Sequence, residues 1–238
     1  MPRESILTDL ISTIPYRLAL AGGWIDQPFM SRHDPSPPGS MVVVGLEPTS
    51  WFMERAGIAT STRKTAVDLW NGIIPDRPFG ELVRELYAEE NREKTQPSGS
   101  QDMVGLIYPG VSRLDYDYEY EGGVFPKHIE STTDPEIASW LQSVIHILPL
   151  GQRPLGYDPL TEKRLDPGWV RRLGQTGQDC YEAILNQNTE GLGSAMSECM
   201  ACWEVLLPAS VRCPSVNVDL LALLRYYQDR YEGAAFSG

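Results

Sequence analysis

Positive charge is scarce in this chain of 238 residues. It has 20 Lys and Arg residues against 32 Asp and Glu residues, which gives a formal net charge of -12 at pH 7. A protein with this balance repels the phosphate backbone of nucleic acids and the headgroups of anionic lipids. We therefore expect no nucleic-acid partner.

Long hydrophobic runs are missing as well. No segment approaches the roughly 20 apolar residues that a membrane-spanning helix needs. The apolar run at residues 6–14 is interrupted by polar and acidic side chains, unlike the apolar core of a signal peptide. We expect no membrane partner and a cytoplasmic location, with a hydrophobic content of 42% that is enough for an ordinary core.

Histidine and cysteine are few, and the histidines show no metal-ligand spacing. The three histidines lie far apart. The cysteines all lie in the last third of the chain: Cys180, Cys199, Cys202 and Cys213. Cys199 and Cys202 fall within a helical pattern, whereas zinc ligands more often come from a knuckle or a turn. We predict that the cysteines are small buried side chains with reduced thiols, and the alternative is a metal or redox role.

Short apolar runs in the first two thirds of the chain predict β-strands. Residues 17–21 and 41–46 are apolar, and the second run is rich in β-branched side chains. Residues 108–126 combine Tyr, Asp and Gly and indicate strands joined by turns. Residues 144–150 are expected to form another buried strand.

Apolar residues at helical spacing predict helices, most of them late in the chain. The predicted helices lie at residues 60–71, 79–91, 170–185, 192–206 and 218–231. Strands early and helices late predict an α+β fold.

The first stretch whose side chains could take part in chemistry covers residues 15–26 and has the sequence PYRLALAGGWID. It places Arg17 in the first predicted strand and Asp26 after a glycine pair. A guanidinium can stabilise a migrating phosphoryl group, and a carboxylate accepts hydrogen bonds from vicinal hydroxyls. The alternative is a buried strand followed by a glycine turn, with Asp26 as a turn residue.

The second stretch covers residues 57–66 and reads GIATSTRKTA. Its hydroxyl residues Thr60, Ser61 and Thr62 stand at a predicted helix start, where free N–H groups and the helix dipole favour phosphate. The alternative is an ordinary helix N-cap.

The third stretch covers residues 98–105 and reads SGSQDMVG. Asp102 is a carboxylate, which can accept a hydrogen bond from a hydroxyl and take its proton. The alternative is an acidic residue attracted to the first turn of a short helix by the helix dipole.

In order and spacing, the three stretches resemble the GHMP kinases, the superfamily of galactokinase, homoserine kinase, mevalonate kinase and phosphomevalonate kinase. The likeness is strongest to the branch that includes the heptose-phosphate kinases. It implies that Asp102 and Arg17 are the catalytic residues. It also implies a sugar site formed by Asp26, Gly23, Trp24 and Gln101.

The same resemblance implies ATP and Mg²⁺ as cofactors. The residues that it assigns to the phosphate loop are Gly57, Ala59, Thr60, Ser61, Thr62 and Arg63. Ala59 stands where a glycine is usual, and Arg63 stands where a small residue is usual. The magnesium ligands would be Ser61 and an acidic residue of the helix before Asp102, either Glu89 or Glu90, with Glu90 preferred.

The fold implied by the resemblance is a two-lobed GHMP kinase. Residues 1–145 would form the N-terminal, ATP-binding lobe, and residues 146–238 a ferredoxin-like C-terminal lobe. The chain ends in GAAFSG, which resembles the beginning of the family's third motif, so we expect this lobe to be incomplete. The glycine-rich residues 190–195 superficially resemble a phosphate loop, but they come after Asp102 and are predicted to begin a helix.

The predicted function is that of an ATP-dependent kinase that phosphorylates a sugar or sugar-phosphate hydroxyl, which the resemblance implies is anomeric. Its partners would be the sugar and ATP, with the oligomeric state open. One alternative is a non-catalytic sugar- or nucleotide-binding regulatory homologue, which Ala59, Arg63 and the incomplete third motif favour. A purely structural module is a third interpretation, and it would leave Arg17, Asp26 and Asp102 far apart.

Overall fold

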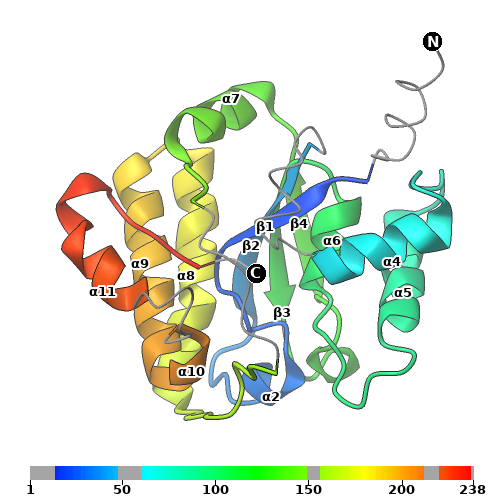
Figure 1. The fold of residues 1–238 in the computed structure, drawn as a ribbon, viewed down its shortest axis with the longest axis horizontal. Coiled ribbons are helices and arrows are strands. Elements are labelled where there is room, and N and C mark those ends of the chain that lie inside the picture. Colours follow the sequence, from blue (N-terminus) through cyan, green and yellow to red (C-terminus); the bar gives the residue numbers. More distant parts are fainter. Residues whose placement is uncertain (1–13, 48–59, 149–155, 212–219, 237–238) are drawn as a thin grey trace.

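The computed structural model describes residues 14–47, 60–148, 156–211 and 220–236. An antiparallel sheet of four strands lies between two groups of helices (Figure 1). One group comes from the middle of the chain and the other from its last third. The predicted α+β class is therefore confirmed.

The strands follow one another in the sheet in the order of the sequence: β1 (Tyr16–Ala21), β2 (Gly39–Leu46), β3 (Val111–Tyr116) and β4 (His128–Thr132). Each strand pairs antiparallel with the next, and Arg17 lies opposite Gly45. All six residues of β1 are buried because helices cover both faces of the sheet. The strands predicted at residues 17–21 and 41–46 are confirmed.

The long connection between β2 and β3 carries the first group of helices: α4 (Thr60–Trp70), α5 (Phe79–Glu90) and α6 (Gln101–Ile107). A single turn of helix, α2 (Pro28–Ser31), precedes β2. Helix α6 packs on β1 and β2, and its residues 103–107 are all buried. Asp102 occupies the first turn of α6, which is the position that the alternative interpretation of this stretch gives it.

The strand predicted at residues 144–150 is wrong for residues 144–148, while residues 149–150 lie outside the described residues. Helix α7 (Pro135–Val144) runs into this segment, and residues 145–148 have no regular structure. The Asp134 carboxylate caps the helix by accepting from the Glu136 N–H at 2.8 Å. The buried face of α7 is formed by Ile137 and Leu141, whereas Leu148 is 77% exposed. The apolar run lacked a sheet neighbour to pair with.

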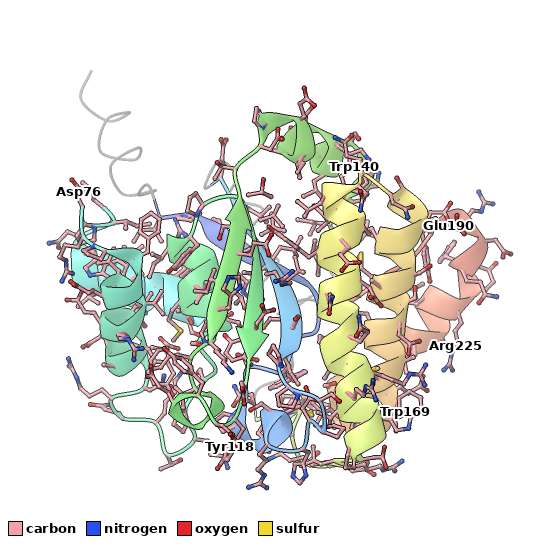
Figure 2. All side chains as sticks on the ribbon, turned by 180° about the vertical axis from the view of Figure 1, so that it is seen from behind. Asp76, Tyr118, Trp140, Trp169, Glu190 and Arg225 are labelled. Atoms are coloured by element: carbon pink, nitrogen blue, oxygen red, sulfur yellow. The ribbon has the colours of Figure 1, made fainter. Side chains whose placement is uncertain are left out.

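The last third of the chain is helical: α8 (Pro167–Leu185), α9 (Thr189–Leu206), α10 (Pro208–Val211) and α11 (Leu220–Tyr226). Helices α8 and α9 lie side by side, and Figure 2 shows Trp169 and Glu190, near their respective starts, at opposite ends of the pair. The Asn188 side chain caps α9 by accepting from the Gly191 N–H at 3.1 Å. The glycine-rich residues 190–195 are thus part of a helix start, as predicted.

Helix α8 approaches the sheet closely through a glycine. A Cβ added at Gly177 would lie 2.0 Å from the backbone oxygen of Ser40, so only glycine allows this spacing between α8 and β2. Residues of α8 and α9 belong to the same hydrophobic cluster as the sheet. Residues 156–211 and 220–236 form helices and no strand.

Two further observations concern expectations from composition. Cys180, Cys199 and Cys202 are buried and free, as predicted, while Cys213 lies outside the described residues. Within the described part of the chain, no helix has both the length and the apolar character needed to cross a membrane.

Candidate active site

An ion pair joins the first strand to helix α6. Arg17 on β1 is buried, and its Nη2 donates to Oδ1 of Asp102. One turn further along α6, a Cβ added at Gly105 would lie 2.1 Å from Cγ of Arg17. Helix α6 therefore offers both the carboxylate that holds the guanidinium and the space that the stem of Arg17 occupies.

A tight turn after β1 brings Asp26 close to the Arg17–Asp102 pair. Trp24 has a φ of 78°, and Asp26 has no exposed surface. Oδ1 of Asp26 accepts from Nε2 of Gln101 at 3.1 Å. A Cβ added at Gly99 would lie 1.6 Å from Oδ2 of Asp26, so glycine is required for the carboxylate to fit here.

The electrostatics of Asp26 differ from those of an ordinary carboxyl group. Burial raises the pKa of Asp26 from its ordinary 3.8 to about 7, and the negative charge of Asp102 raises it as well. The positive charge of Arg17 lowers this pKa but does not offset the burial. Asp26 therefore changes its charge near neutral pH.

Hydrogen-bonding capacity is left unused in this cluster. In the described parts of the chain, the buried side-chain atoms without a partner are Nε of Arg17, Oδ2 of Asp26 and Oε1 of Gln101. Arg17 is a member of the Arg17–Asp102 pair, and Asp26 and Gln101 lie beside that pair. Buried polar atoms in proteins are almost always partnered. One donor and two acceptors gathered in one place therefore mark this cluster as the best candidate for a polar ligand.

Helix α9 supports the turn that carries Asp26. Nε1 of Trp203 donates to the Gly23 oxygen at 2.9 Å, and a Cβ added at Gly23 would lie 2.7 Å from Cζ2 of Trp203. In the sequence, Trp203 has only the features of a core residue, because nothing local signals a contact 180 residues away. Trp24, assigned to the sugar site, packs partly buried against the core.

The predicted phosphate loop is described only in part. Gly57 and Ala59 lie outside the described residues, as does the side chain of Thr60 at the start of α4. Ser61 is exposed, while Thr62 is buried with its Oγ1 at 3.5 Å from Oδ2 of Asp102. The first turn of α4 is thus adjacent to the Arg17–Asp102 pair.

Arg63 points toward the beginning of β1. Its Nε donates to the Ile14 oxygen at 3.1 Å, and its guanidinium lies over the Tyr16 ring at 4.2 Å from the ring centroid. Arg63 is buried. These contacts give it a packing role beside its predicted role in binding the nucleotide.

Glu90, the acidic residue preferred as a magnesium ligand, has a partner for each of its carboxylate oxygens. Oε2 of Glu90 accepts from Oγ1 of Thr65 at 2.6 Å, and Oε1 accepts from Nζ of Lys94 at 2.5 Å. Glu89 instead pairs with Arg92. No three His, Cys, Asp or Glu residues among those described are grouped to hold a metal ion.

No family model and no curated protein matches the chain. What can be said of function therefore comes from the residues and from how the fold arranges them.

Proposed function

We propose that this protein is an ATP-dependent sugar kinase of the GHMP type. The observation that carries the proposal is the meeting of Arg17, Asp26, Gln101 and Asp102 in one buried cluster. Arg17 and Asp102 lie 85 positions apart in the sequence, and Asp26 and Gln101 lie 75 apart. A purely structural module has no need to gather these side chains and leave three of their polar atoms without partners.

Asp102 and Arg17 would act on the reacting groups. The Asp102 carboxylate would orient the attacking hydroxyl and accept its proton, while the Arg17 guanidinium would stabilise negative charge on the transferred phosphoryl group. Their ion pair keeps both side chains in place before the ligands bind. Catalysis of phosphoryl transfer depends mainly on such positioning and on charge stabilisation.

Asp26 and Gln101 would bind the sugar. Their free oxygens, Oδ2 and Oε1, are both acceptors when Asp26 is ionised, and sugar hydroxyls supply the donors that these atoms lack. Nε of Arg17 supplies a donor for an acceptor oxygen on the same ligand. The cluster therefore fits a polyhydroxylated ligand better than an apolar one.

The nucleotide would bind at the beginning of α4, where N–H groups and the hydroxyls of Ser61 and Thr62 are next to the ion pair. Magnesium, when bound with ATP, neutralises charge on the phosphates. Glu90, however, does not fit as its ligand, because both carboxylate oxygens are already partnered. Within this proposal, residues 1–145 would hold the nucleotide and the sugar, while the described part of residues 146–238 supplies helices that pack on the same sheet.

The test is ADP formation by the purified protein with ATP, Mg²⁺ and a panel of sugars and sugar phosphates. We expect one class of sugar to stimulate ADP formation. Asp102→Asn should lower turnover at least about 100-fold, because a general base contributes that much or more. Asp179→Asn, at an exposed position of α8, is the matched control and should be silent.

Two outcomes would count against the proposal. ADP formation within threefold of the parent in Asp102→Asn would show that Asp102 is not the catalytic carboxylate. Binding of sugar and ATP without any ADP formation by the parent would favour the regulatory homologue.

A further inference from the structure

Lys94 places a positive charge where the sequence predicts a metal ion. Glu90 ends helix α5 with its side chain 4% exposed. Nζ of Lys94 lies 2.5 Å from Oε1 of Glu90 and 2.7 Å from Oγ of Ser98. On the other side, Oγ1 of Thr65 donates to Oε2 of Glu90 at 2.6 Å and lies 3.1 Å from the Ser61 oxygen. The ammonium group thus lies among carboxylate and hydroxyl oxygens.

These oxygens are the kind that divalent cations prefer. Mg²⁺ and Mn²⁺ bind hard oxygen ligands such as carboxylates and hydroxyls. A buried carboxylate needs a countercharge, and Lys94 supplies one from the same helix end. A divalent cation at Glu90 would therefore have to displace the ammonium or lie beside it against strong repulsion.

We propose that Lys94 is a built-in counter-ion that keeps divalent cations off Glu90, so that Lys94 and the cation compete for one position. This inference deepens the proposed function. In a kinase, it means that magnesium arrives with the nucleotide and is not held in advance by Glu90. The ammonium charge of Lys94 then stands near the beginning of α4 in place of a protein-bound cation.

The test uses Mn²⁺ alone, without nucleotide or sugar, and measures free Mn²⁺ by electron paramagnetic resonance. Lys94→Met removes the ammonium and leaves the oxygens of Glu90 and Ser98 in place. We expect this variant to bind Mn²⁺ at least about tenfold more tightly than the parent, because a unit positive charge is removed from beside the cation. The gain should disappear when Glu90→Gln is added.

The matched control is Lys127→Met. This variant has the same change in net charge and also releases a carboxylate from a lysine, since Nζ of Lys127 lies 2.9 Å from Oδ2 of Asp117. The two variants differ in the groups around the carboxylate that loses its lysine, which is Glu90 in Lys94→Met and Asp117 in Lys127→Met. A gain of similar size in Lys127→Met would show a general charge effect and would overturn the proposal.

Other results would overturn it as well. These are an unchanged Mn²⁺ affinity in Lys94→Met, or a gain that survives Glu90→Gln. If Lys94→Met does not fold, Lys94→Gln keeps a donor near Glu90 and is subject to the same criteria. Failure of the proposed function would be distinguishable, because a protein without kinase activity can still show the Mn²⁺ competition.

Discussion

Two buried aspartates near the sheet have opposite surroundings. Asp115 on β3 accepts from Oγ of Ser40 at 2.7 Å and from Nε of Arg113 at 3.0 Å, and its Oδ2 lies 3.3 Å from Nδ1 of His128. Asp26 has one side-chain partner, Gln101, and a buried oxygen without any. A saturated carboxylate stabilises the strands around it, whereas an unsaturated one is stabilised only when a ligand arrives. Burial of an acid alone does not distinguish these roles, but the count of its partners does.

The largest expected effect is on the pH dependence of stability at Asp26. Its pKa is raised to about 7 in the folded protein, so the folded state holds a proton that the unfolded state has lost between pH 3.8 and about 7. The free energy of unfolding should therefore fall as pH rises through this window, by about 4 kcal/mol relative to Asp26→Asn, and stay level above it. Urea unfolding of both proteins from pH 4 to 8 measures the difference. Parallel curves would contradict the raised pKa.

Asp115→Asn should lower the free energy of unfolding, in contrast to Asp26→Asn. It leaves Arg113 and Ser40 with weaker or missing acceptors, and we expect a loss of about 3 kcal/mol in the free energy of unfolding. At pH 8, Asp26→Asn should be neutral or stabilising in the same urea experiment. The contrast between the two residues would fail if both substitutions destabilised the protein equally.

A smaller effect is expected at Gly105, which gives Arg17 its space. Gly105→Ala places a Cβ 2.1 Å from Cγ of Arg17 and should cost about 1 to 3 kcal/mol through overpacking. Gly80→Ala in α5 is the control, because an added Cβ there meets nothing within 4 Å. Thermal unfolding of the two variants measures the difference.

The cost of Gly105→Ala should shrink in an Arg17→Ala background, where the stem of the arginine is absent. An undiminished cost in the double variant would show that Gly105 serves the packing of α6 and not the position of Arg17.

Local sequence predicted most helices and the first two strands. The helices that begin at Thr60 and Phe79 follow from apolar spacing, and the helix after Asn188 has a side-chain cap as well; both signals act within a few residues. The wrong strand prediction at residues 144–150 has the same cause, because it too rests on local signals alone. An apolar run of that length fits a strand or a helix end equally well, and Asp134 with Pro135 started a helix ten residues earlier.

By itself, the sequence determined the chemical types at the candidate site and their order: an arginine in a strand, an aspartate after two glycines, and a second aspartate at a helix start. Only the tertiary structure decided which of these side chains meet and which of their atoms stay unpartnered. In the folded chain Arg17 pairs with Asp102, and Oδ2 of Asp26 has no partner. The two carboxylate oxygens of Glu90 accept from Thr65 and Lys94. The physical reason is that these outcomes depend on the register of β1 and β2 and on the packing of α6 against them, contacts between residues that are distant in the chain.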